Sequence, residues 1–457
     1  MIRITRHYVD VPQGDGSLRR VHYRQAGSGP PLLMVHQSPR NSGEYAPLIE
    51  RWAEHFTCIA PDTPGFGQSD PLPGAPEIDD FADALVATMD ALGLPPCPAY
   101  GFHSGGIILV TALKRHPERF TGLAIGGYAI WTPQEMALFG ERYLPPFEPS
   151  SCGEHLVWLW HRMLEQSWFF PWFDVRDAAR LPGAHADVAR IDMAVREMLD
   201  SGAAYRAGYG AVLRAPRDIP PADAVTPPVL ISAYDGDPLQ AHIDRLGAMP
   251  QGWRAEKCAS PADHQARSLA FLQQLLQADV LVLAQSDDAG FLPVQTDRFD
   301  GLIHWQGDRG SSVLVVHAPG EELRRGTSGA LAIDLPGHGL SDPWPGDAPS
   351  DWAAWQQVID TVAAHFGLTD IRLPDVPQAD ADLLFPDLSP DRYGTHLIRA
   401  WQIVRARHFF APHHAVGAAN AIAFDPDTVR PECLAGEHRA LLRATAARAC
   451  YQAITKR

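Results

Sequence analysis

A long-period internal repeat constrains the fold of this chain more than any other feature of its sequence. The segment ALAIDLPGHGLSDPWPG, residues 330–346, matches CIAPDTPGFGQSDPLPG, residues 58–74. Two further pairs of segments match in the same order, residues 19–39 with 301–320 and residues 146–160 with 386–401. Because similarity at fixed offsets is the signature of repeated structural units, we predict a tandem duplication.

The second copy is shorter than the first. The offset between the copies is 274 residues at Leu94 and Leu368 and 241 residues at Gly153 and Gly394, a difference of 33 residues. We therefore expect copy two to lack the counterpart of about residues 95–128, together with the last two strands and the final helix of copy one. Its expected role is structural, such as packing against copy one, covering an apolar face or imitating a dimer partner.

The first 280 residues alternate short apolar segments with helical patterns, which is typical of an α/β fold with a mostly parallel sheet. The predicted strands are residues 32–36, 58–61, 98–101, 122–126, 229–233 and 253–258, and the predicted helices are 80–92, 105–115 and 266–277. Between residues 128 and 224 the strand signals vanish and aromatic residues gather. We predict a helical cap there, with a minority of its rings lining a pocket.

This pattern divides the chain into an α/β core, an aromatic-rich helical cap, a truncated second α/β half and a second cap-like helical region. The core is expected over residues 1–127 and 225–280, the cap over 128–224, the second half over 285–375 and the second cap-like region over 376–457. A chain of 457 residues is too long for one compact core, which agrees with several domains.

Composition excludes several classes of function. A formal charge of −16 argues against nucleic acid and anionic membranes as partners. The start of the chain does not resemble a signal peptide, and six scattered cysteines fit reduced thiols, so we expect a cytoplasmic protein. No metal-ligand spacing, dinucleotide motif or phosphate loop is present, so no cofactor and no metal are implied.

Five motifs follow one another along copy one: MVHQSPRNS, APDTPGFGQSD, GFHSGG followed by HPERF, VLISAYDGDPL and SPADHQARSLAFLQQLL. In this order and spacing they resemble the capped α/β-hydrolases, which include haloalkane dehalogenases, epoxide hydrolases and esterases. The resemblance implies an α/β-hydrolase fold with a helical cap, followed by a degenerate, incomplete second α/β-hydrolase-like repeat. It also implies a cofactor-independent hydrolase or lyase, although this fold supports many reactions.

The family's nucleophile occupies a sharp turn with a small residue two positions away on either side. Gly101 and Gly105 satisfy this pattern with His103 at the centre, whereas centring Ser104 would put a phenylalanine where a small residue is needed. The His-Pro pair found about fourteen residues past the nucleophile also fits, because Pro117 lies fourteen residues after His103. We therefore predict a histidine at the nucleophile position.

The resemblance assigns the other site residues. Asp237 matches the family's acid, with Asp235 in reserve, and His264 matches the general base and is expected to pair with Asp237. The backbone N–H groups of Gln37 and Ser104 are expected to form the oxyanion hole. Four residues with copy-two counterparts are expected to be structural instead: His36, Asp62, Ser69 and His155.

Three functions remain open at this point. His103 could act with His264 and Asp237 as a nucleophile or base on a small apolar or aromatic substrate with an ester or other carbonyl group. Ser104 could instead be the nucleophile of a serine hydrolase with a distorted turn. The chain could also be a non-catalytic binder of a small apolar ligand. A homodimer is possible in each case.

Overall fold

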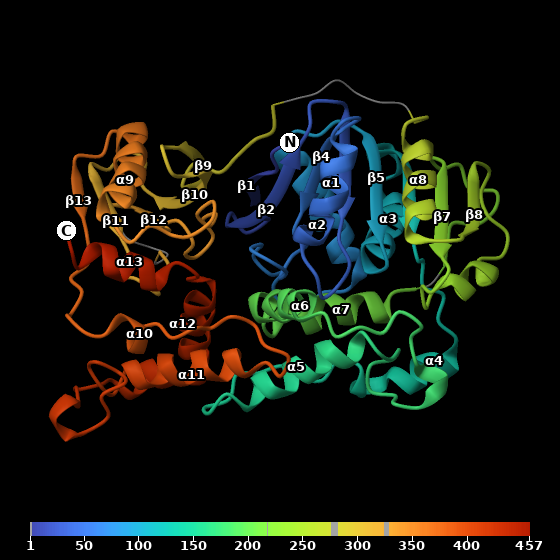
Figure 1. Cartoon of the computed structure of the whole chain (residues 1–457). Helices are drawn as coiled ribbons and strands as arrows, with labels where there is room; N and C mark the ends of the chain where they lie inside the picture. The colour runs from blue at the N-terminus through green and yellow to red at the C-terminus, as the bar shows by residue number, and fades with distance from the viewer. Residues whose placement is uncertain (1, 217, 276–281, 324–328) are drawn as a thin grey trace. The chain divides into compact units, whose positions relative to one another are not determined.

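The computed structural model describes residues 1–457 except residues 1, 217, 276–281 and 324–328 (Figure 1). The chain divides into two compact units. Unit 1 comprises Met1–Glu148 and His161–Gln285, and unit 2 comprises Pro149–Trp160 and Ser286–Arg457. The sequence assigned residues 149–160 to the first cap, so their place in unit 2 was not anticipated.

Unit 1 is built on an eight-stranded sheet with the strand order β1-β2-β4-β3-β5-β6-β7-β8. β2 is antiparallel to both β1 and β4, and the remaining neighbours are parallel. The strands are β1 (Thr5–Pro12), β2 (Leu18–Ala26), β3 (Pro31–Val35), β4 (Thr57–Pro61), β5 (Cys97–Phe102), β6 (Phe120–Gly126), β7 (Val229–Tyr234) and β8 (Trp253–Cys258). The six strands predicted from the sequence correspond to β3–β8.

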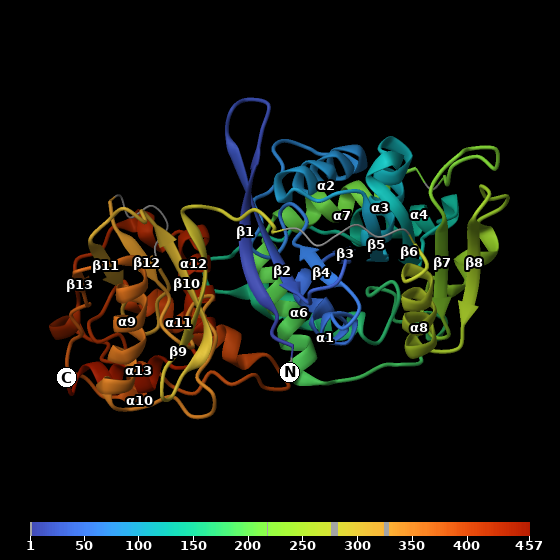
Figure 2. The same ribbon diagram turned by 90° about the horizontal axis from the view of Figure 1, so that it is seen from above.

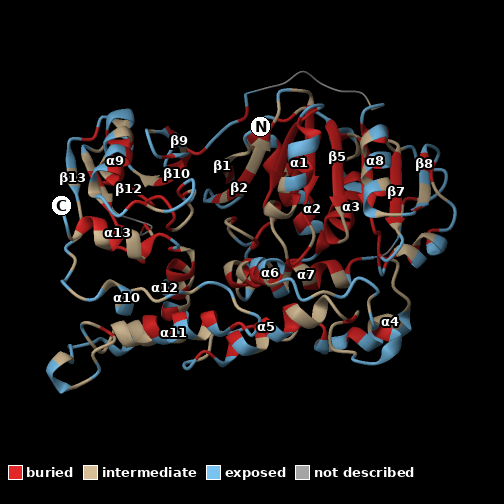
Figure 3. Cartoon of the chain, viewed as in Figure 1, coloured by how far each residue is buried: buried red, intermediate tan, exposed pale blue. Residues whose placement is uncertain are grey.

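Helices cover both faces of this sheet, α2 and α3 on one face and α1 and α8 on the other (Figure 2). Leu33 and Val35 of β3 belong to the core beside α2 and α3, whereas Leu32 and Met34 belong to the core beside α1 and α8. Because successive side chains of a strand point to opposite faces, a strand covered on both sides is apolar throughout. Figure 3 accordingly shows the central strands as buried. These helices are α1 (Ala46–Trp52), α2 (Ile78–Leu92), α3 (Ser104–Arg115) and α8 (Pro261–Leu272).

The last helix of unit 1 starts earlier than predicted. The Ser260 side chain accepts the backbone N–H of Asp263, and Pro261 occupies the first helical position, so α8 begins at residue 261 and not at 266. It ends at Leu272. The predicted end at residue 277 lies outside the described residues.

Four helices lie between β6 and β7 where the cap was predicted: α4 (Pro133–Phe139), α5 (Glu154–Gln166), α6 (Val188–Ser201) and α7 (Ala204–Arg214). In the described residues of this region the backbone pairing is limited to one isolated bridge, between Phe169 and Arg180. The first residues of α5 belong to unit 2 and its last residues to unit 1.

Unit 2 contains a five-stranded sheet with the order β13-β11-β12-β10-β9. Taken from the opposite edge, this order and its parallel and antiparallel pairings match those of β1-β2-β4-β3-β5 in unit 1. The strands are β9 (Ala289–Gln295), β10 (Asp300–Gly307), β11 (Val313–Val316), β12 (Leu331–Ile333) and β13 (Asp370–Arg372). The unit-2 helices are α9 (Trp352–Phe366), α10 (Ala381–Leu384), α11 (Thr395–Arg407), α12 (Pro431–Arg443) and α13 (Ala447–Ile454).

The expected gap in copy two needs one correction. β13 occupies the position of β5 and pairs in parallel with β11, so the start of that strand is retained. β13 has three residues, of which Asp370 and Arg372 are exposed. So short a strand shows no recognisable pattern in the sequence, which is why it was not predicted. After β13, the described residues contain no counterpart of α3 or β6.

A buried histidine–aspartate pair connects β2 of unit 1 to the turn after β4. His22 Nδ1 lies 2.8 Å from Asp62 Oδ2, and Asp62 Oδ1 accepts the backbone N–H of Ser42. Ser69 Oγ donates to the Asp62 carbonyl. Burial alone would raise the pKa of Asp62, but the charge and hydrogen bond of His22 hold it well below its usual value.

Unit 2 repeats this arrangement with the same atoms. His304 Nδ1 lies 2.7 Å from Asp334 Oδ2, the backbone N–H of Leu323 donates to Asp334 Oδ1, and Ser341 Oγ donates to the Asp334 carbonyl. Burial opposes ionisation here too, but the hydrogen bond and charge of His304 lower the pKa of Asp334 to about 2. The described residues of unit 2 contain no counterpart of the turn at residue 103, yet unit 2 has the same hydrogen-bond network. This network therefore stabilises the fold.

His36 of unit 1 and His317 of unit 2 also correspond. In each, Nδ1 lies near the carbonyl of the next residue, 3.0 Å from Gln37 O and 2.8 Å from Ala318 O. In each, Nε2 accepts a backbone N–H from the loop that follows β4 or β12. Both histidines therefore connect loops of their units through hydrogen bonds.

None of the helices in the described part of the chain combines the length and apolar character needed to cross a membrane.

Replacing Asp334 with asparagine is expected to weaken unit 2 and not unit 1. The change removes the carboxylate that His304 and two backbone N–H groups share, and breaking a buried pair costs about 3–5 kcal/mol. Hydrogen exchange should therefore accelerate in β10 and β12 and not in β2 and β4. Asp62→Asn is the matched control, for which the pattern should be reversed. Unchanged exchange in β10 and β12 would contradict this role.

Candidate active site

A single residue makes the turn between β5 and α3. β5 ends at Phe102 and α3 begins at Ser104, which leaves His103 at the apex. Its backbone angles are φ 48° and ψ −113°, and it is the one non-glycine residue with positive φ among those the structure describes. Such a conformation is strained for an L-residue and persists only where the surroundings enforce it. The structure thus places His103, and not Ser104, at the centre of the turn.

Close packing explains why glycines stand two residues before and after His103. A Cβ at Gly105 would lie 2.0 Å from the carbonyl oxygen of Val35, which is closer than any real contact. A Cβ at Gly101 would lie 2.9 Å from the backbone carbonyl carbon of Gly105. Neither position can accept a side chain while β3, β5 and α3 keep these positions.

His103 pairs directly with Asp237, which follows β7. His103 Nε2 lies 3.2 Å from each carboxylate oxygen of Asp237, and the backbone N–H of Leu239 donates to Oδ1 at 2.8 Å. Burial would raise the pKa of Asp237, but the charge and hydrogen bond of His103 keep it below its usual value. Gly127 makes room for the pair, since a Cβ there would lie 2.4 Å from His103 Cδ2. Asp235, the reserve acid, is exposed and forms no hydrogen bond with either histidine.

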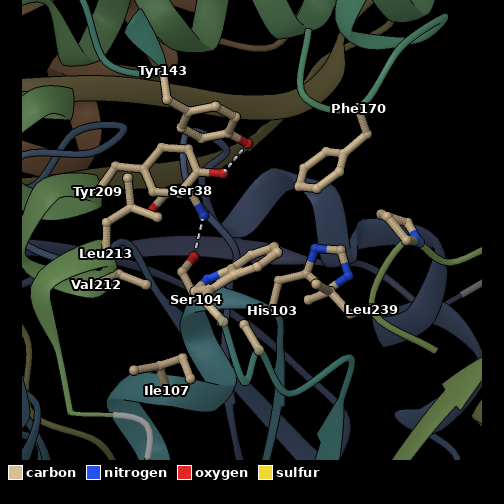
Figure 4. Close-up of a pocket in the computed structure, with 13 residues that line it drawn as sticks. Ser38, His103, Ser104, Ile107, Tyr143, Phe170, Tyr209, Val212, Leu213 and Leu239 are labelled. Carbon is tan, nitrogen blue, oxygen red and sulfur yellow. Dashed lines mark hydrogen bonds between the residues drawn. The ribbon is translucent and has the colours of Figure 1, made fainter. Parts of the chain in front are cut away.

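This pairing fixes the tautomer of the His103 ring. With an ionised carboxylate beside Nε2, the neutral imidazole carries its proton on Nε2 and leaves a lone pair on Nδ1. Within the described residues Nδ1 has no hydrogen-bond partner, and 26% of the side chain is exposed. Figure 4 shows the ring inside a pocket, beneath Phe170. Nδ1 is therefore available to a ligand.

His264 does not pair with Asp237, so that prediction was wrong. Its Nε2 lies 3.0 Å from the Tyr100 hydroxyl and its Nδ1 lies 2.8 Å from Ser232 Oγ, which engages both ring nitrogens. The residue is 1% exposed, and burial lowers its pKa to about 4. The physical reason is that Asp237 is already paired with His103, while Tyr100 and Ser232 hold both nitrogens of the buried His264 ring.

The backbone N–H beside His103 belongs to Ser38 and not to Gln37. The Gln37 N–H donates to Glu44 Oε1 at 2.7 Å, and its side-chain amide donates to the other carboxylate oxygen. The Ser38 N–H donates to Ser104 Oγ at 2.5 Å, and both serines line the pocket with His103. Ser104 thus lies where the sequence predicted a donor, whereas Gln37 does not.

A pocket lies above His103. Its base is formed by Ser38, His103 and Ser104, and the Tyr143 and Tyr209 hydroxyls meet at 3.0 Å on its cap side (Figure 4). Between these polar groups the walls are apolar: Ile107, Ala129, Trp131, Phe170, Val212, Leu213, Pro238 and Leu239. The described residues include no group of three or more His, Cys, Asp or Glu side chains arranged to hold a metal ion.

Comparison with known proteins agrees with this architecture. A family model described as the alpha/beta hydrolase fold matches residues 30–147, which contain β3–β6 and the turn at His103. The first unit has the α/β-hydrolase fold. In this α/β-hydrolase unit a helical segment lies between β6 and β7, and His103 occupies the turn between β5 and α3.

Curated relatives match only part of the chain. Haloalkane dehalogenase 2 of Mycobacterium tuberculosis is 33% identical over 125 residues, 27% of this chain and 44% of that protein. (E)-2-((N-methylformamido)methylene)succinate hydrolase of Acinetobacter baylyi is 29% identical over 107 residues, 23% of this chain and 41% of that protein. The chain thus spans less than half the length of these relatives. A solved structure, epoxide hydrolase A of Mycobacterium thermoresistibile, has 18% identity and a TM-score of 0.45, covering 60% of this chain and all of that one.

Sequence reasoning missed three polar residues of the α/β-hydrolase site. Ser38 lies one residue after Gln37, the predicted donor. The choice between these two neighbours rested only on their distance from His36 along the chain. Tyr143 and Tyr209 lie 66 residues apart in the cap, and no sequence signal brings their hydroxyls together. The aromatic cap signal did indicate a pocket, and two of its rings, Trp131 and Phe170, line it.

The burial of His264 makes the stability of the α/β-hydrolase unit depend on pH. Its pKa is about 4 in the folded state and about 6.5 when unfolded. The unfolded chain therefore binds more protons between these values, so a contribution of about 3 kcal/mol is present above pH 6.5 and lost as the pH falls towards 4. His264→Gln removes this titration. Denaturant unfolding at pH 7 and pH 4 should show the advantage of the wild type over this variant shrinking at the lower pH, and a constant difference would contradict the assignment.

Proposed function

We propose that unit 1 is a cofactor-independent hydrolase of small apolar esters, with His103 and Asp237 as its catalytic dyad. The observation that carries this proposal is the contact of His103 Nε2 with both Asp237 oxygens at the strained apex below an apolar pocket. Strained backbone and buried ionisable pairs reduce the free energy of unfolding, and both are found mainly at functional sites, where they take part in the mechanism. The relatives named as a dehalogenase and a hydrolase support hydrolytic chemistry at this position.

The proposed reaction uses the free nitrogen of His103. Nδ1 accepts a proton from a water molecule as the water oxygen attacks the ester carbonyl, and the imidazolium that forms is stabilised by Asp237. The same nitrogen then returns the proton to the leaving alkoxide as the C–O bond breaks, which yields a carboxylic acid and an alcohol. In an alternative route Nδ1 attacks the ester carbonyl directly, and the alkoxide leaves as the C–O bond breaks and takes a proton from solvent. Water then hydrolyses the acyl-imidazole, which releases the carboxylic acid and restores the imidazole.

Ser104 supplies the proposed oxyanion site. As the first residue of α3, it has a backbone N–H without an intrahelical acceptor, and a helix N-terminus favours negative charge. Its side-chain oxygen accepts the Ser38 N–H, which leaves the hydroxyl proton free to donate to a substrate oxygen. Two donors from one residue can thus stabilise charge developing on the carbonyl oxygen.

The pocket suggests the class of substrate. The mostly apolar walls of the pocket suit a small apolar or aromatic acyl group. The hydroxyl pair of Tyr143 and Tyr209 can hydrogen-bond one polar atom of the substrate at the end away from His103. We place a single ester or lactone carbonyl over Ser104 and the apolar remainder against Trp131 and Phe170.

A second candidate is a non-catalytic binder of a small apolar ligand. The observation that favours it is the burial of His264, because the site holds one accessible imidazole where the family uses a nucleophile and a separate base. The serine-hydrolase alternative has less support, since Ser104 Oγ contacts the Ser38 N–H and no histidine within the described residues.

Kinetics of single variants test the dyad. His103→Gln is expected to lower kcat/KM on short-chain aryl esters by about 10³-fold, because it removes the base, and Asp237→Asn by about 10²-fold, because it alters the tautomer and the charge. Asp235→Asn is the matched control, an exposed carboxylate two residues from Asp237, and should retain wild-type rates. Thermal unfolding of each variant separates lost chemistry from lost structure.

Two results would contradict the dyad. Labelling by a fluorophosphonate probe that disappears in Ser104→Ala would identify a serine hydrolase. Absence of turnover over a panel of short esters, lactones and β-keto acids, together with tight binding of an apolar ligand, would identify the binder.

A further inference from the structure

Unit 2 contains a helix pair whose two members come from corresponding places in the two copies. Residues 149–160 lie in copy one and include the start of α5, whereas residues 390–401 lie in copy two and include the start of α11. At an offset of 241 residues the two segments share a glycine, a histidine, a leucine and a tryptophan. These pairs are Gly153 with Gly394, His155 with His396, Leu156 with Leu397 and Trp160 with Trp401.

The tryptophan side chains make reciprocal hydrogen bonds. Trp160 Nε1 donates to the carbonyl of Arg392 at 3.2 Å, and Trp401 Nε1 donates to the carbonyl of Ser151, also at 3.2 Å. Ser151 and Arg392 are themselves 241 residues apart. Each tryptophan therefore donates to the carbonyl at the same relative position of the opposite segment.

Ring contacts follow the same rule. The Trp160 ring meets the His396 ring edge-on, with centroids 5.5 Å apart at 84°, and the Trp401 ring meets the His155 ring at 4.9 Å and 77°. Both tryptophans are at most 2% exposed. Each half of the contact thus reproduces the other.

A glycine lies beneath each tryptophan. A Cβ at Gly394 would lie 2.6 Å from Trp160 Cγ, and a Cβ at Gly153 would lie 3.1 Å from Trp401 Cδ1. Both glycines have positive φ, 69° and 87°. Any larger residue would displace the indole, so the glycine and the tryptophan of opposite segments are required together.

When residue i contacts residue j of a partner and j contacts i in return, the contact has the form of a two-fold interface between identical chains. We propose that residues 149–160 and 390–401 form an internalised homodimer interface, in which copy two occupies the surface that a second copy of the same segment would fill. Each segment carries both the glycine and the tryptophan, so each is complementary to itself. This inference is independent of the proposed ester hydrolysis.

The duplication explains why copy two retains this motif. Among the described residues copy two has no counterpart of the turn at residue 103, yet it keeps every side chain of this contact. Joining both halves in one chain raises their effective concentration to about the millimolar range, which favours the internal contact over contact with another molecule. We therefore expect the wild-type chain of 50.0 kDa to be a monomer with respect to this surface.

Opening the contact from one side should produce a dimer. Gly394→Leu together with Trp401→Ala disables the 390–401 segment and leaves residues 149–160 intact, so two chains can pair through Gly153 and Trp160. Sedimentation equilibrium at tens of micromolar should show a monomeric wild type and a doubled mass for this variant. The mirror variant, Gly153→Leu with Trp160→Ala, should dimerise through residues 390–401.

Adding Gly153→Leu to the first variant is the matched control, because it removes the remaining complementary surface. This triple variant should return to a monomer, which separates specific pairing from aggregation of exposed apolar surface. Circular dichroism confirms that each variant is folded. Three results would each overturn the proposal. The first is a dimeric wild type whose mass is unchanged by both pairs of substitutions, and the second is folded double variants that stay monomeric. The third is a triple variant that still associates.

Discussion

The sharp turn at residue 103 is the constraint on which the proposed chemistry of this protein depends. The chain passes from β5 to α3 through one residue with φ 48°, and Gly105 brings α3 against the carbonyl of Val35 so closely that no Cβ fits. Because β3, β5 and α3 pack in two apolar cores, one on each face of the sheet, the packing of the sheet enforces the strained backbone. The side chain at position 103 is thereby directed into the pocket, whatever its identity.

An imidazole at this turn changes how the acid is used. The histidine ring is long enough to reach Asp237 without an intervening base, and the two are in direct contact. His264 therefore does not pair with Asp237 as the general base that the family resemblance implies. Its ring is buried beside Tyr100 and Ser232, and burial keeps it neutral by lowering its pKa. The histidine at the apex and the burial of His264 together distinguish this site from the one that the family resemblance implies.

A comparison of the two units shows which structural features they share and which only unit 1 has. Unit 2 has the same order of five strands and the same buried histidine–aspartate pair, and it contains the reciprocal contacts that Trp160 and Trp401 each make with the opposite segment. In its described residues it lacks the turn, the helix after it and the strands beyond. What persists is what buries apolar surface or satisfies buried polar groups, since loss of either costs free energy in any protein of this shape.

The sequence by itself determined β3–β8, because a strand covered on both faces must be apolar, and it determined the position of His103, because only glycines fit two residues away on either side. The tertiary structure alone decided that Asp237 contacts His103 and not His264, that Ser38 supplies the neighbouring N–H, and that residues 149–160 pack within unit 2. The first group follows from local sterics and periodicity, which a sequence displays directly. The second depends on which side chains meet across segments distant in the chain, and only the packed fold fixes that.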